Sequence, residues 1–137
     1  MQKHLIRAAE AGDAESQFNL GVLYENEVID SRYVAEGSRP ESIRWFLAAA
    51  EQGLARAQVK LAEMYNSEPQ GSVKACEWFL LATRGLRGEH LRKAQSAYQR
   101  AATRLTPVET AEVSRFVQGW KPKTHAAGSL REQNLAL

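Results

Sequence analysis

The chain has very little of what catalytic or disulfide-stabilised small proteins are built on. Its 137 residues include one cysteine, Cys76, and three histidines, His4, His90 and His125, that lie far apart. A single cysteine excludes a disulfide within the chain, and the histidines show none of the spacings that bind zinc. Glycine-rich phosphate loops and the common hydrolase motifs are missing too. We therefore expect no enzyme activity, no metal and no cofactor.

Long apolar runs are also missing. A membrane-spanning helix needs about 18 to 20 consecutive apolar residues, and no stretch of the sequence approaches that length. Lys3, His4 and Arg7 are not followed by an apolar segment before Glu10, so the first residues do not form a signal peptide. We expect no membrane partner and, if the chain is complete, a cytoplasmic location.

The small net charge of +2 is unevenly distributed. Residues 1–83 carry 8 basic and 12 acidic side chains, whereas residues 84–137 carry 10 basic and 4 acidic ones. A basic half can attract RNA or another polyanion, and we keep this as an alternative hypothesis. The sequence favours the simpler interpretation of a solvated basic surface, so we do not expect a nucleic-acid partner.

What the chain does have is an internal repeat. Residues 8–24 and 49–65 align without a gap at a distance of 41 residues. Eight of the 17 aligned positions are identical: Ala8 and Ala49, Ala9 and Ala50, Glu10 and Glu51, Gly12 and Gly53, Ala14 and Ala55, Gln17 and Gln58, Leu20 and Leu61, Tyr24 and Tyr65. The sequence Trp-Phe-Leu at 45–47 recurs at 78–80, and a weaker third copy begins at Ala94. Such a period predicts one structural unit stacked several times.

Apolar spacing and breaking residues divide the chain into seven expected helices. They cover about residues 2–11, 14–25, 40–52, 55–66, 72–84, 89–104 and 107–118, and residues 25–40 are expected to contain a loop. Gly12 and Gly53 can end helices with a positive φ, and Asp13 can cap the next helix. Residues 38–41 and 106–109 have the spacing of capping boxes. Gly21 lies inside an expected helix, which predicts a packing reason for it.

These residues resemble the Sel-one-like repeat family, a relative of the tetratricopeptide repeats. The resemblance rests on Gly, Ala-Gln, Leu and Tyr recurring in register with Trp and Ala-Ala, and it spans about residues 4–104. Two departures are that Ala62 replaces the second glycine and that the third unit lacks the tyrosine. The resemblance implies an all-α fold, a right-handed α/α superhelix of antiparallel helix pairs over residues 1–120, followed by a tail at 121–137. It also implies a concave face used as a scaffold or adaptor.

In such an array the first helix of each unit faces both the core and the concave groove. Gln17, Leu20 and Tyr24, with their counterparts, are the expected core positions. The other face is expected to bind a partner protein or peptide. It holds Glu15, Phe18, Asn19 and Val22 in the first unit, Arg56, Val59, Lys60 and Glu63 in the second, and Lys93, Ser96, Ala97 and Arg100 in the third. The charge runs from mildly acidic to basic, which suits a peptide of opposite charge order.

Two further hypotheses concern the ends and the aromatic residues. The first expected helix lacks a preceding partner helix, so Leu5 and Ile6, or the tail at 121–137, are candidate contacts for a homo-oligomer. The Trp-Phe pairs at 45–46 and 78–79 could form a stacking platform for single-stranded nucleic acid. Their repeated position favours core packing instead, and the apolar neighbours of Cys76 favour a buried thiol.

Overall fold

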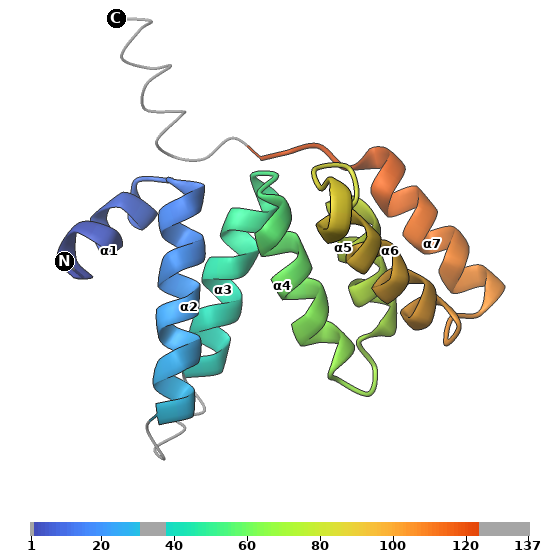
Figure 1. Ribbon diagram of the computed structural model, residues 1–137, viewed down its shortest axis with the longest axis horizontal. Coiled ribbons are helices and arrows are strands. Elements are labelled where there is room, and N and C mark those ends of the chain that lie inside the picture. The colour runs from blue at the N-terminus through green and yellow to red at the C-terminus, as the bar shows by residue number, and fades with distance from the viewer. Residues whose placement is uncertain (1, 31–37, 124–137) are drawn as a thin grey trace, which may run out of the picture. The chain divides into compact units, whose positions relative to one another are not determined.

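The computed structural model describes residues 2–30 and 38–123. All regular secondary structure in these ranges is helical, and the elements are α1 (Gln2–Glu10), α2 (Ala14–Asp30), α3 (Ser38–Glu51), α4 (Ala55–Asn66), α5 (Ser72–Ala82), α6 (Gly88–Ala102) and α7 (Pro107–Gly119). Helices that follow one another pack together: α1 on α2, α2 on α3, α4 on α5 and α5 on α6 (Figure 1). Helix α7 packs on α5. The described residues confirm the all-α class and the seven helices.

Helix α2 is longer than the sequence pattern indicates. It continues to Asp30, so the prediction of a loop from residue 25 is wrong for residues 25–30. The segment after Tyr24 contains neither glycine nor proline before residue 37, so nothing in its covalent structure stops the helix there. The prediction is also wrong for residues 38–40, which belong to α3. Residues 31–37 of the predicted loop and the tail from residue 124 lie outside the described residues.

The chain forms two compact units. Unit 1 is Met1–Gln52 together with the segment that starts at Pro122, and unit 2 is Gly53–Lys121. Unit 1 therefore contains α1 to α3, and unit 2 contains α4 to α7. In unit 1, the backbone N–H of Lys123 donates to the carbonyl of Glu51 at 2.7 Å, and Lys123 Nζ lies 2.5 Å from Glu51 Oε2. The segment after α7 is thus fixed to the end of α3.

In unit 1, α2 and α3 approach closely at Gly21. A Cβ atom on Gly21 would lie 2.8 Å from ring atoms of Phe46, which is fully buried. The ring of Phe18 packs against the same Phe46 ring, with centroids 5.5 Å apart. Gly21 therefore has the packing reason that its place inside a helix predicts.

A buried amide joins the helices of unit 1. Gln17, which is fully buried, donates from Nε2 to the carbonyl of Ala9 in α1 at 3.0 Å. Gln52, just after α3, donates to Gln17 Oε1 at 2.9 Å and to the carbonyl of Gly12 at 2.9 Å. A buried amide costs stability unless its polar atoms are paired, and these bonds meet that need.

Unit 2 has its own core. Cys76 in α5, Ala101 in α6 and Val113 in α7 form a buried cluster, against which Leu80 and Tyr98 pack. Elsewhere in the unit, Trp78 in α5 meets Phe116 in α7 edge to face, with ring centroids 5.6 Å apart. The predicted burial of the Cys76 thiol is confirmed, and Phe46, Trp78 and Phe79 are buried as core residues, whereas Trp45 is half-buried.

Aligned positions of the two sequence copies have similar burial. Gln17 and Gln58 are 0% and 3% exposed, and Leu20 and Leu61 are 3% and 0% exposed, although each pair belongs to two different units. The two tyrosines of the repeat, Tyr24 and Tyr65, are half-buried. Aligned residues of the two sequence copies are therefore buried to a similar extent.

The helix ends follow the predicted local chemistry in three places. Gly12 and Gly53 have φ values of 105° and 100°. Asp13 accepts hydrogen bonds from the backbone and hydroxyl of Ser16, at 3.0 and 2.5 Å, and so caps α2. Thr106 and Glu109 form the predicted capping box at the start of α7. The capping box predicted at 38–41 falls largely outside the residues whose side chains are described.

Candidate functional site

A groove in unit 2 lies between α4 and α6. Its volume is about 470 Å³. It is lined by Glu63 of α4 and by six residues of α6, namely Glu89, Arg92, Lys93, Ser96, Ala97 and Arg100. Five of these seven residues are among those predicted to face a partner: Glu63, Lys93, Ser96, Ala97 and Arg100. The structure thus brings together side chains that the sequence pattern places 30 or so residues apart.

Helical periodicity explains how α6 presents these side chains. Lys93, Ser96, Ala97 and Arg100 follow the i, i+3, i+4, i+7 spacing that keeps residues on one face of a helix. Ala94 and Ala101, which are 3% and 2% exposed, follow Lys93 and Arg100 directly and therefore lie about 100° round the helix from them. The burial of these small residues fixes the rotation of α6, so the charged residues on the flanking face form the groove wall.

The groove carries more positive than negative charge. Arg92, Lys93 and Arg100 supply three cations, and Glu63 and Glu89 supply two carboxylates. All five side chains are exposed. None of them makes a hydrogen bond or an ion pair with another residue in the described ranges. The excess of positive charge would favour a bound anionic group.

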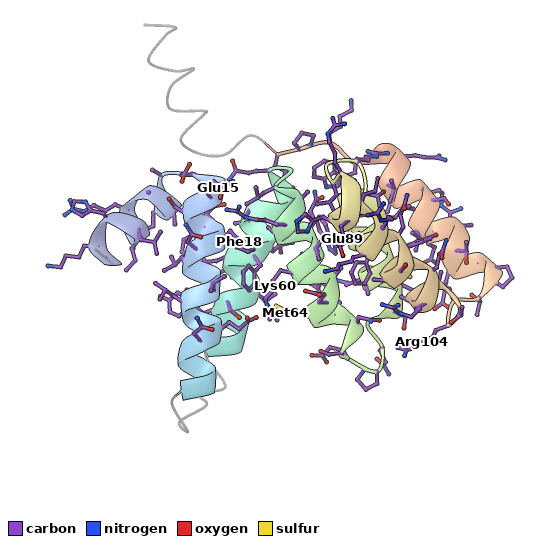
Figure 2. The ribbon with its side chains drawn as sticks, in the orientation of Figure 1. Glu15, Phe18, Lys60, Met64, Glu89 and Arg104 are labelled. Carbon is purple, nitrogen blue, oxygen red and sulfur yellow. The ribbon has the colours of Figure 1, made fainter. Side chains whose placement is uncertain are left out.

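The remaining predicted residues of unit 2 lie outside this groove. Arg56 is exposed, and Val59 and Lys60 are half-buried in α4. Figure 2 shows Lys60 and Met64 one turn apart on α4, and Glu89 at the start of α6. Only the last of the four positions predicted on α4, Glu63, contributes to the groove wall.

The four positions predicted on α2 belong to unit 1 and have two different environments. Glu15 and Asn19 are exposed, whereas Phe18 and Val22 are half-buried. Phe18 contacts Phe46 of α3, so part of its ring serves the packing of unit 1 (Figure 2). The contact with Phe46 comes from tertiary packing, which the repeat alignment alone does not contain.

Sequence reasoning missed two residues of the groove, Glu89 and Arg92. The third copy of the sequence repeat begins at Ala94, so the predicted face includes no residue of α6 before that position apart from Lys93. The signal was present, because Glu89 lies four residues before Lys93 and therefore shares its face. Extending the stripe backwards by one turn would have found both.

Three titratable groups with raised pKa values lie on α5 and α6 of unit 2. Burial, with a smaller effect of the Glu77 charge, raises the pKa of Cys76 from 9.0 to about 11. Burial also raises the pKa of Glu77 and of Tyr98. A thiol with a raised pKa is a poor nucleophile. His4 and His90 are exposed, and His125 lies outside the described residues.

The described residues contain neither a metal-binding cluster nor a membrane-spanning helix. Among residues 2–30 and 38–123, no three histidine, cysteine, aspartate or glutamate side chains gather closely enough to hold a metal ion. Within the same ranges, no helix combines the length and the apolar character that crossing a membrane requires.

Comparisons with known proteins give no relative from which a function could be transferred. The chain matches no family model, no curated protein and no solved structure. The seven helices of the described residues and the charged groove between α4 and α6 are therefore the features from which its function has to be argued.

Proposed function

We propose that this chain is a protein-binding module, without catalytic activity, that holds a peptide segment of its partner in the groove between α4 and α6. The observation that supports this is the groove itself. Its walls come from equivalent helices of successive repeats, and its charged side chains have no partners among the described residues. Helical repeat arrays present their binding residues in this way, on the first helices of neighbouring units.

The repeat also supports an architecture. We infer that the helices continue the pattern of Sel-one-like repeats and form a right-handed α/α superhelix. The equivalent burial of Gln17 and Gln58, and of Leu20 and Leu61, supports this because repeated core positions are what such arrays stack. The close approach at Gly21 supports it as well, since small residues at that position let paired helices approach.

A peptide fits the groove better than a nucleic acid does. None of the seven lining residues is aromatic, so the groove offers no surface on which a base could stack. Glu63 and Glu89 would repel a continuous row of phosphates. A peptide presents charges at separate positions along its length, and it can satisfy both signs of charge in the groove.

Selection from a random peptide library displayed on phage tests this proposal. The full chain is the bait, and each selected peptide is measured again with the variant Lys93→Glu/Arg100→Glu. A matched variant, Arg104→Glu/Arg115→Glu, makes the same change in net charge at exposed residues outside the groove. We expect the selected peptides to lose binding to the groove variant and to keep binding to the control.

Two results would count against the proposal. One is a library that yields no peptide above background. The other is a set of peptides that bind both variants as they bind the unaltered chain, because their site would then lie elsewhere. Circular dichroism of both variants verifies that each remains folded.

A further inference from the structure

The spacing of the cations in the groove points to one class of ligand. We infer that the groove between α4 and α6 binds an acidic peptide in an extended, polyproline II conformation, with two carboxylates three positions apart. This inference rests on the proposed function and specifies the ligand of the same groove. It follows from Lys93, Ser96, Ala97 and Arg100 and from the two carboxylates beside them.

The distance between Lys93 and Arg100 along α6 matches the repeat distance of a polyproline II helix. Lys93 and Arg100 are seven residues apart, so their Cα atoms are separated by about 10.5 Å along one face of the helix. In a polyproline II helix, residues i and i+3 lie on the same side and are separated by about 9 Å. Flexible lysine and arginine side chains easily bridge the small difference. Two carboxylates at i and i+3 can therefore each meet one cation.

The residues between the two cations are suited to contact a peptide backbone. Ser96 and Ala97 lie midway along the same face of α6, and both line the groove. A peptide in the polyproline II conformation has no internal hydrogen bonds, so its backbone groups need partners. The Ser96 hydroxyl can donate to or accept from that backbone, and the methyl group of Ala97 leaves room for it to approach.

The carboxylates of Glu63 and Glu89 limit how much negative charge a ligand of the groove can have. Unit 2 as a whole carries 11 basic and 6 acidic side chains, which alone would favour any polyanion. Carboxylates from both walls of the groove oppose a ligand that is negative at every position. The groove therefore favours a ligand with two well-spaced carboxylates over a uniform row of phosphates.

Fluorescence anisotropy of short synthetic peptides with the full chain tests the inference. The main probe is a dye-labelled peptide of proline and glycine with two glutamates separated by two prolines. One control peptide has the same composition with the glutamates adjacent, and another has glutamine in place of glutamate. Each exposed ion pair contributes up to about fivefold to affinity. We therefore expect the main probe to bind up to about fivefold more tightly than the adjacent-glutamate control, which can form one pair, and up to about 25-fold more tightly than the glutamine control, which can form neither.

Exchanging the charges sharpens this test. The variant Lys93→Glu/Arg100→Glu should lose the acidic peptide and gain affinity for a peptide with lysine in place of both glutamates. Arg104→Glu/Arg115→Glu should bind the acidic peptide as the unaltered chain does. Recovered binding by the exchanged pair cannot come from general unfolding, so it reports on contacts made in the groove.

The possible outcomes separate the inference from the proposed function. Equal binding of the spaced and the adjacent glutamates, or of glutamate and glutamine, would overturn the inference while peptide binding in the groove stands. Library peptides that bind the groove without acidic residues would do the same. Tighter binding of poly-uridylate that displaces the peptides, with affinity falling steeply as salt rises, would overturn both.

Discussion

Gly21 and Phe46 share a space in unit 1 that no larger residue at position 21 can enter without displacing the ring. The ring of Phe46 is fully buried and also packs against Phe18, so it has little freedom to move away. Glycine inside a helix lowers stability by about 1 kcal/mol relative to alanine. At this position the close approach of α2 to α3 requires it nevertheless.

Gly21→Ala should therefore destabilise the protein even though alanine is the better helix former. Overpacking costs about 1 to 3 kcal/mol, which outweighs a gain in helix propensity of about 1 kcal/mol or less. Urea unfolding followed by circular dichroism measures the difference. Gly119→Ala is the matched control, since a Cβ there meets nothing within 4 Å, and it should leave stability unchanged or slightly higher. Equal effects of the two changes would contradict the packing argument.

The buried Cys76 thiol should make the stability depend on pH in the alkaline range. Its pKa is raised from 9.0 to about 11 in the folded protein, so between these values the unfolded chain has lost the proton and the folded one has kept it. Its contribution is complete below pH 9 and falls as pH rises to about 11, by at most about 1.4 kcal/mol per pH unit.

The measurement compares the unaltered chain with Cys76→Ala in urea from pH 7 to roughly pH 10, where the thiol shift acts. We expect the stability advantage of the unaltered chain to shrink as pH rises. A thiol reagent should also leave Cys76 unmodified in the folded protein and modify it quickly in denaturant. A constant difference between the two proteins, together with fast modification of the folded chain, would show that the thiol is accessible.

At the scale of single elements, the start of α7 depends on a reciprocal pair of hydrogen bonds. The backbone N–H of Glu109 donates to Thr106 Oγ1 at 3.1 Å, and the backbone N–H of Thr106 donates to Glu109 Oε1 at 2.9 Å. Pro107 follows at the first helical position, where no amide donor is needed. These contacts give α7 a defined first turn.

Thr106→Ala should lower the free energy of unfolding by about 1 kcal/mol, because it leaves the Glu109 amide without its cap. Chemical denaturation of the full chain measures this, with Ser114→Ala, an exposed position later in α7, as the control. The control should change stability by no more than a few tenths of a kcal/mol. A loss at position 114 as large as that at 106 would mean that the cap is not the cause.

The elements that sequence reasoning predicted well are those fixed by neighbouring residues. Gly12, Gly53 and Thr106 carry their turn and cap chemistry within a few positions, and the helix ends next to them were predicted within two residues. The end of α2 was missed because the segment after Tyr24 lacks any residue that stops a helix. Phe18 contacts Phe46, which lies 28 positions away in the sequence. Local sequence patterns contain no information about such a contact.

The groove was partly predictable for the same reason. Periodicity along α6 identified Lys93, Ser96 and Arg100 as one face, and the structure confirms that they line one wall. Periodicity gives no information about which positions of α4 face that wall, and only Glu63 of the four predicted there does. The division into two units, with a segment near residue 123 belonging to the first, depends on contacts between distant parts of the chain.

At the scale of the whole molecule, the two units predict separable folding. Gly53–Lys121 contains its own core cluster and both walls of the groove. A fragment of these residues should remain helical, unfold cooperatively in urea and retain the peptide affinity of the full chain, because unit 1 supplies none of the groove residues. A fragment with the circular dichroism spectrum of an unfolded chain would contradict this, and so would a folded fragment without affinity.

The contact between Lys123 and Glu51 has a consequence for the order in which the protein is made. Because unit 1 includes the segment from Pro122, it is incomplete on the ribosome until that segment has left the exit tunnel, whereas every residue of unit 2 has been synthesised before then. Although α1 to α3 emerge first, the unit to which they belong is therefore completed last. During synthesis the contact of Glu51, at the end of α3, cannot form until Lys123 has been translated 72 residues later.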